Sequence, residues 1–148
     1  MDKNTTILFR SLCPIATGLD VLGDKWSLLI LRDMIFFHKS TFNEFKTALE
    51  LMPSKMLSNR LKKLEATGFI SRKKGEKNKK SVYYFLEEKG LETFPIMVEI
   101  ALFTTDFYYD HLGDTYTGVV KTRMKNDKEN YIKEMIDSYK EFKDNLVL

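Results

Sequence analysis

Basic side chains are concentrated in one part of this chain, residues 53–80. The segment holds ten basic and two acidic residues, so its charge is +8, whereas the whole 148-residue chain carries +3 and the remainder is acidic. Positive charge gathered on an otherwise acidic protein favours a polyanionic partner such as nucleic acid. A solvated, lysine-rich loop is the alternative that charge alone leaves open.

A helix predicted over residues 53–67 has two different faces. Leu57, Leu61 and Leu64 recur at helical spacing and form a face for the core. The far face carries short polar and basic side chains that suit base edges in the major groove, since lysine donates to guanine, asparagine pairs with adenine and serine does either. The candidate contacts of this helix with nucleic acid are Ser54, Lys55, Ser58, Asn59, Arg60, Lys62 and Lys63.

Three members of this set have further interpretations. Lys62 and Lys63 come late on the helix, where contacts with phosphate are expected rather than contacts with bases. Arg60 lies toward the boundary of the apolar face, so an internal salt bridge is an equally supported alternative for its guanidinium group.

A basic hairpin is predicted to follow this helix. Gly68 suits a left-handed cap at the helix C-terminus, because glycine has no Cβ to strain that conformation. Residues 69–74 and 81–86 are predicted strands around a polar, basic tip at 75–80. Basic loops beside such a helix usually touch phosphate or the minor groove, although some of these lysines serve solubility alone in the alternative interpretation. The candidate contacts of this wing are Lys74, Lys77, Lys79 and Lys80.

Helices that position this pair of elements are predicted before it. Pro14 suits the first turn of a short helix over residues 14–22. Asp24 can cap the next helix, residues 25–37, whose apolar side chains cover most of its circumference and place it at the centre of the core. Thr41 can cap a third helix over residues 42–49, with apolar residues on one face. Together with residues 53–67, this third helix forms a helix-turn-helix.

The segment after the wing, residues 87–112, is predicted to be helical and is apolar on all sides. Such a helix must be buried on two sides, and a second copy of the chain is the simplest partner. Pro95 either kinks this helix or separates two shorter ones. Residues 113–148 begin with a polar link and end in an amphipathic helix, for which dimer packing is the preferred role and covering a pocket or binding another protein are alternatives.

These elements predict a mainly α (α+β) fold: a winged helix-turn-helix with a two-stranded wing, flanking dimerisation helices and a C-terminal helical extension. The expected division is a DNA-binding domain with its dimer helices over residues 10–112 and an extension over 113–148. The most apolar stretch, residues 94–109, is interrupted by charge and shorter than the roughly 20 residues that a spanning helix needs. With no signal-peptide pattern at the N-terminus either, a cytoplasmic protein without membrane association is expected.

Several separate motifs resemble one family in order and spacing. They are Cys13-Pro14, residues 19–33 (LDVLGDKWSLLILRD), 41–45 (TFNEF), 55–72 (KMLSNRLKKLEATGFISR), 82–84 (VYY) and Gly90. Over about residues 10–112 the chain resembles the HxlR-type family of winged-helix regulators, relatives of MarR-type regulators.

The resemblance implies a homodimer built from the N-terminal helix and the long helix after the wing, bound to pseudo-palindromic double-stranded operator DNA. It supports residues 54–60 as the segment that recognises bases and the region 74–80 as the wing. The chain departs from the family at Pro53-Ser54, where the family usually has a serine or threonine followed by proline. The capping hydroxyl is thereby displaced by one position, which leaves the start of this helix open. Residues 113–148 extend past the family core.

Cys13 is the single cysteine, so no intramolecular disulfide can form, which fits a reducing compartment. In some members of the family a cysteine at this place senses oxidants or electrophiles, and a helix N-terminus favours a thiolate. A small buried hydrophobic residue is the alternative role. A small molecule is a second possible effector, since Phe94, Phe103, Phe107, Tyr108 and Tyr109 could line a pocket, although aromatic residues at helical spacing are more often core.

No enzyme is expected, because the chain has two histidines, one cysteine and no recognisable catalytic or phosphate-binding motif. No cofactor or metal is expected either. The main rival to a DNA-binding regulator is a winged-helix module that binds protein and not DNA, because a fold does not determine a function. Such a module would not need Lys55, Asn59 and Lys62 together on one exposed helix face beside a basic wing.

Overall fold

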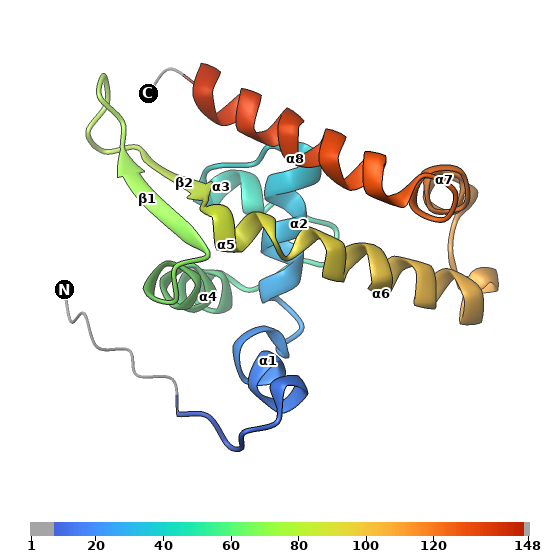
Figure 1. Ribbon diagram of the computed structural model, residues 1–148. Coiled ribbons are helices and arrows are strands. Elements are labelled where there is room, and N and C mark those ends of the chain that lie inside the picture. The colour runs from blue at the N-terminus through green and yellow to red at the C-terminus, as the bar shows by residue number, and fades with distance from the viewer. Residues whose placement is uncertain (1–7, 147–148) are drawn as a thin grey trace.

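The computed structural model describes residues 8–146 and confirms the mainly α winged-helix fold. Within these residues no helix is long and apolar enough to cross a membrane. The elements, in chain order (Figure 1), are α1 (Pro14–Leu22), α2 (Ser27–Phe37), α3 (Phe42–Phe45), α4 (Ser54–Ala66), β1 (Ile70–Lys74), β2 (Val82–Leu86), α5 (Glu88–Leu91), α6 (Phe94–Phe107), the 3-10 turn η1 (Tyr109–His111), α7 (Asp114–Val119), the π-helical turn η2 (Val120–Met124) and α8 (Lys128–Asn145).

Helix α2 stands at the centre of the molecule, as its sequence predicts (Figure 1). Its residues Ile30, Leu31, Met34 and Ile35 are buried among side chains from α4, the sheet, α6 and α8. The helix begins at Ser27, two residues later than predicted, because the chain makes a turn first. The core is thus built around one helix that touches both halves of the chain.

The third helix is much shorter than predicted. Its start is confirmed, because the Thr41 hydroxyl accepts from the Glu44 backbone N–H and the Glu44 carboxylate accepts from the Thr41 N–H, which forms a capping box. The helix was expected to reach Leu49 but ends at Phe45, and Leu49 is 85% exposed. The Thr47 N–H and hydroxyl both donate to the Glu44 carbonyl, so the chain tightens into turns there.

The helix-to-wing junction agrees with its prediction to within one residue. Helix α4 ends at Ala66, and Gly68 adopts the left-handed conformation with a φ of 81°. The Phe69 N–H then bonds to the Leu64 carbonyl at 2.9 Å, which closes the helix end. Strands β1 and β2 pair antiparallel, with Ile70 opposite Leu86 and Lys74 opposite Val82.

Two helices, not one, follow the wing, which settles the alternatives left open for Pro95. Helix α5 ends at Leu91, and α6 begins at Phe94 with Pro95 in its first turn, where a missing N–H costs nothing. Gly90 is needed for close packing, because a Cβ there would lie 2.3 Å from the Phe69 carbonyl oxygen.

The C-terminal segment is helical throughout most of its length, including the region expected to be a link. The amphipathic pattern of α8 is confirmed, since Tyr131 and Tyr139 are buried and Phe142 packs against the core. These side chains pack within their own protomer, next to α2, α6 and the wing, and not on an outward-facing surface for a second copy.

Asp24, in the turn before α2, holds several elements together. Its carboxylate accepts from the N–H groups of Trp26 and Ser27 and from the Ser27 hydroxyl, at 2.6–3.0 Å. It also forms ion pairs with Arg60 at 3.4 Å and Lys63 at 3.9 Å, both on α4. Burial opposes its ionisation, but the hydrogen bonds from Ser27 and Trp26 and the Arg60 charge outweigh that effect and lower the pKa of Asp24. The ionised carboxylate therefore stabilises the attachment of α4.

We predict that Asp24→Asn lowers the free energy of unfolding at pH 7 by about 1–3 kcal/mol, because charged hydrogen bonds are lost. The folded-state pKa lies below the ordinary value of 3.8, so the contribution is complete above that pH and is lost as pH falls through the folded value. The difference between wild type and variant should therefore shrink in urea titrations at decreasing pH. Asp106→Asn, at an exposed carboxylate, is the control, and a difference that does not change with pH would contradict the role of the charge.

Candidate nucleic-acid interface

The outward face of α4 carries the predicted polar residues. Ser54, Lys55, Asn59 and Lys62 are exposed and Ser58 is half-buried. Within residues 8–146 no side-chain hydrogen bond or ion pair is formed by any of the five. Their donors and acceptors are therefore available to a partner molecule.

The start of α4 is also free of a capping side chain. Pro53 occupies the cap position and has no hydroxyl, and the helix begins at Ser54. The Leu57 N–H is the first to bond within the helix, to the Pro53 carbonyl at 2.9 Å. The preceding backbone N–H groups therefore point out of the helix end, where the positive end of the helix dipole suits an anion such as phosphate. The displaced Pro53-Ser54 order thus leaves this end uncapped by side chains.

Arg60 and Lys63 point toward the protein. Arg60 pairs with Asp24, which is the internal salt bridge considered for it, and its Nε atom is buried. Lys63, a predicted phosphate contact, instead donates to the backbone carbonyls of Val21 at 2.9 Å and Asp20 at 3.3 Å. Both side chains lie on the flank of α4 that faces the end of α1. They attach α4 to the N-terminal part of the chain.

The wing presents its lysines on an ordered tip. The Gly75 N–H bonds to the Ser81 carbonyl, and the Ser81 N–H bonds to the Asn78 carbonyl, both at 2.9 Å. Gly75 lies so close to this turn that a Cβ would be 2.8 Å from the Asn78 carbonyl oxygen. The four predicted wing residues, Lys74, Lys77, Lys79 and Lys80, are all exposed.

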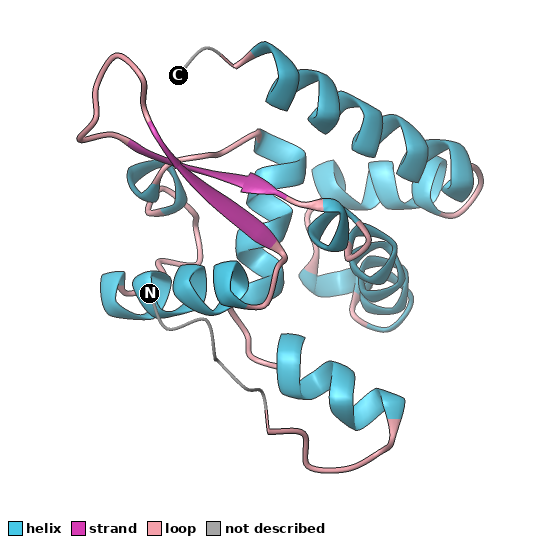
Figure 2. Ribbon diagram, turned by 60° about the vertical axis from the view of Figure 1, so that its left-hand side comes forward, coloured by secondary structure: helices cyan, strands magenta, loops and turns pink. Residues whose placement is uncertain are grey.

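Helix α4 and the wing lie on one side of the molecule. In both Figure 1 and Figure 2 the wing tip and α4 are on the left, whereas α6 and α7 are on the right. Both elements carry exposed basic side chains, and so this side of the molecule has basic residues on two neighbouring elements. Such a surface can neutralise phosphates over a length of duplex while α4 contacts base edges.

A charge network that the sequence analysis missed holds the turn before α4. Arg32 on α2 bonds to both carboxylate oxygens of Glu50, at 2.6 and 3.0 Å, and to Asp33. The hydrogen bond from Arg32 lowers the pKa of Glu50 despite partial burial. Asp33 is buried and also accepts from Lys39 at 2.8 Å. Two adjacent charged residues, Arg32 and Asp33, within an apolar helix are the sequence feature that indicates such a network. Their spacing does not predict that Glu50 and Lys39 are the partners.

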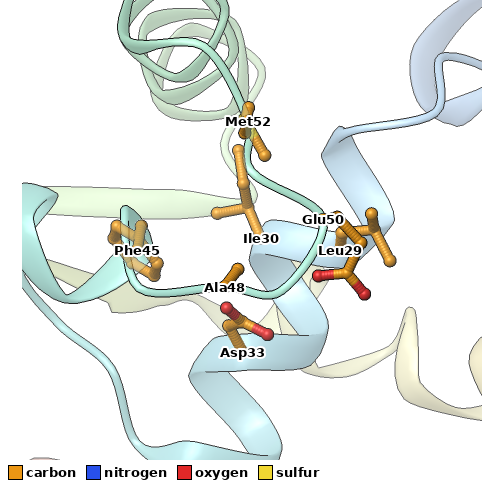
Figure 3. Close-up of a pocket in the computed structure, with 7 residues that line it drawn as sticks. All are labelled: Leu29, Ile30, Asp33, Phe45, Ala48, Glu50 and Met52. Atoms are coloured by element: carbon orange, nitrogen blue, oxygen red, sulfur yellow. The ribbon is translucent and has the colours of Figure 1, made fainter.

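The small cavity beside this network is a packing feature. Its volume is about 10 Å³, which is room for one water molecule at most. As Figure 3 shows, it lies between α2 and the turn before α4, and its lining residues are Leu29, Ile30, Asp33, Phe45, Ala48, Glu50 and Met52.

The aromatic residues considered for an effector pocket do not gather around one cavity of the protomer. Phe94 is buried in the core, where its ring packs edge-on against Phe36 at 5.4 Å. The other four are at the surface: Phe103, Phe107, Tyr108 and Tyr109. Cys13 is exposed at the start of α1 as a free thiol, so it is not a buried hydrophobic residue of the protomer core.

Two apolar stripes remain uncovered in the protomer. Helix α6 exposes Ile96, Ile100, Phe103 and Phe107 at spacings of four, three and four residues. Helix α1 has no buried residue and, with the residues before it, exposes Leu12, Ile15 and Leu19. Figure 1 shows α1 projecting from the body of the molecule.

Comparison with known proteins identifies the same fold and class. Residues 21–111 match the family model of the HxlR-like helix-turn-helix. The chain is 33% identical over 92 residues to the HTH-type transcriptional regulator YybR of Bacillus subtilis, covering 60% of this chain and 70% of that protein. It is 31% identical over 114 residues to the HTH-type transcriptional regulator YtcD of the same organism, covering 77% of this chain and 89% of YtcD.

Solved structures agree. The redox regulator HypR in its oxidised form superimposes with a TM-score of 0.56 and 30% identity, covering 64% of this chain and 96% of HypR. The reduced form of the transcriptional regulator YodB from B. subtilis gives a TM-score of 0.54 and 26% identity, covering 66% of this chain and 95% of YodB. These family members and structural neighbours are transcriptional regulators and not enzymes. The resemblance in the sequence motifs is therefore confirmed: the chain belongs to the HxlR-like helix-turn-helix family and is a transcriptional regulator.

Proposed function

We propose that this regulator binds operator DNA as a homodimer, with α4 in the major groove and the wing on the backbone or in the minor groove. The observation that carries the proposal is the free polar face of α4. Ser54, Lys55, Ser58 and Asn59 have no side-chain partners within the described chain, and their helix α4 lies on the same side of the molecule as the wing. Lys55 and Asn59 recognise bases, whereas Lys62 and the wing lysines contact phosphate.

The dimer is supported by the two uncovered stripes. Exposed apolar residues aligned over three turns of one helix are costly in water and mark a contact surface. Because α1 projects from the body and carries a second such stripe, a second copy can cover both stripes at once. A two-fold dimer would then present two α4 helices to successive turns of the major groove.

The predicted effect on DNA binding is specific to α4. Binding to the DNA that flanks the gene is measured across a salt series. Lys55→Ala/Asn59→Ala should weaken this binding by at least about tenfold, because base contacts worth about 1–3 kcal/mol each are lost. The variant should also show a smaller preference for the flanking DNA over unrelated DNA. Lys133→Ala, which removes an exposed charge on α8, should leave both quantities unchanged.

Absence of salt-sensitive DNA binding by the wild type, reduced or oxidised, would favour the protein-interaction module instead. Equal weakening on all sequences would assign Lys55 and Asn59 to phosphate and move base recognition elsewhere.

The dimer prediction concerns α6. Ile100→Glu/Phe103→Glu should convert the protein to a monomer in sedimentation velocity, since two carboxylates would be buried in an apolar contact. These residues are 48% and 59% exposed in the protomer, so the helical circular dichroism should be retained. Leu49→Glu, at an exposed apolar residue in the turn before α4, is the matched control. A variant that sediments like wild type would place the interface elsewhere.

A redox response through Cys13 is a second proposal, favoured by its exposed thiol and by the likeness to HypR and YodB. Diamide would oxidise the Cys13 thiols of two protomers to a disulfide and be reduced to the hydrazine. Treatment should then change the operator affinity of wild type but not of Cys13→Ser, as measured by fluorescence anisotropy. The same response in both proteins would exclude Cys13 as the sensor.

A further inference from the structure

The backbone N–H and C=O of Leu86, the last residue of β2, do not pair with β1. The Glu87 N–H bonds to the Phe69 carbonyl on the β1 side, so the alternation of an antiparallel ladder turns the N–H and C=O of Leu86 the other way. Leu86 is buried, and backbone groups in such a place need partners.

Helix α8 supplies both partners. The Leu86 N–H donates to the Tyr139 hydroxyl oxygen at 2.8 Å, and the Leu86 carbonyl accepts from Lys143 Nζ at 2.9 Å. Tyr139 is 0% exposed, and this burial raises its pKa to about 12, so the hydroxyl stays protonated in any physiological buffer. Lys143 also pairs with Glu87 at 3.5 Å, which extends the attachment to the start of α5.

The same turn of α8 touches the entrance to the helix-turn-helix. The Phe142 ring stacks on His38 with ring centroids 4.6 Å apart, and Tyr139 meets the same imidazole edge-on at 6.1 Å. His38 is the C-cap residue that follows α2, and it adopts a left-handed conformation with a φ of 52°. Two residues later, the Ser40 carbonyl accepts from the Tyr84 N–H of β2 at 2.7 Å, directly before the cap of α3.

Helix α8 therefore contacts the wing strand and the helix-turn-helix at the same time. Figure 1 shows it running from α7 across the molecule toward the wing. A depression of about 290 Å³ remains between α8 and the β2–α5 junction, crossed by ion pairs from Lys143 to Glu87 and from Lys140 to Glu88. These contacts come from a segment outside the matched family region, which ends at residue 111.

We propose that α8 is a brace that sets the position of the wing relative to α4, with Tyr139 and Lys143 as positioning residues for the wing's contacts with DNA. The inference rests on the proposed DNA binding. It gives the C-terminal extension a role in operator affinity that does not involve touching DNA. It also makes Leu86 the point where the extension acts on the wing.

The first test needs no DNA. Amide exchange of Leu86, followed by NMR or mass spectrometry, should be about tenfold faster in Tyr139→Phe, because the hydroxyl acceptor is removed while the ring is kept. Tyr131→Phe removes a hydroxyl from the same helix and should leave Leu86 exchange unchanged. Unchanged Leu86 exchange in Tyr139→Phe would overturn the brace.

The second test asks whether the brace serves the wing. In the wild-type background, Lys77→Ala/Lys79→Ala should lower the operator affinity severalfold and reduce its salt dependence. In the Tyr139→Phe background, the same double substitution should change the logarithm of the affinity by less than half as much. In this cycle, the Lys143→Arg background should give the same loss of operator affinity as wild type. The Lys143→Met background should give the reduced loss expected for Tyr139→Phe. An equal loss in both backgrounds would mean that α8 does not position the wing.

The two tests separate this inference from the proposed function. Without DNA binding by wild type, the proposed function and the wing's role in it both fail, and Leu86 exchange still decides whether α8 holds β2. With DNA binding but an additive double-mutant cycle, the proposed function stands and the positioning role is rejected.

Discussion

The burial of one face of α4 is the interaction on which the rest of this structure depends. Leu57, Leu61 and Leu64 are almost completely buried, and each contributes about 1.5–3 kcal/mol from apolar surface removed from water. Their helical spacing leaves the opposite face outside, and the ion pairs of Arg60 and Lys63 with Asp24 oppose rotation of the helix about its axis. Because its rotation is fixed by these contacts, α4 always exposes the same side chains to a partner molecule.

Further contacts hold the elements next to α4 in place. The Arg32–Glu50 pair holds the turn that leads into α4, and the capping box of Thr41 and Glu44 determines where α3 starts. On the other side, α8 contacts Leu86 and thereby the strand that carries the wing. Helix α4 is thus held by the end of α1, the turn after it and Arg32 on α2, and the wing is held in part by the C-terminal extension.

Much of this arrangement could be predicted from sequence, because it depends on local signals. Pro14, Thr41 and Gly68 mark element ends through backbone geometry or capping, and the leucine spacing identifies the core face of α4. The length of α3 could not be predicted, since the hydroxyl of Thr47 competes with helical bonding after Phe45. Propensity alone does not decide that competition.

The remaining differences between prediction and structure involve hydrogen bonds between residues that are far apart in the chain. Lys63 bonds to carbonyls more than forty residues away, and Tyr139 bonds to a strand residue more than fifty residues away. No periodicity in a single sequence reveals such pairs. The amphipathic pattern of α8 correctly predicts which side chains are buried, but only the structure shows that they are buried within the protomer.

We propose that two α4 helices of a dimer recognise one operator from the major groove. Interference by methylation of guanine N7 tests it most directly, because that atom lies in the major groove. We expect two clusters of interfering guanines whose centres lie about 10 base pairs apart or at a multiple of that spacing, related by the operator's two-fold symmetry. A single cluster, or binding that is insensitive to N7 methylation throughout the protected region, would contradict recognition by paired α4 helices.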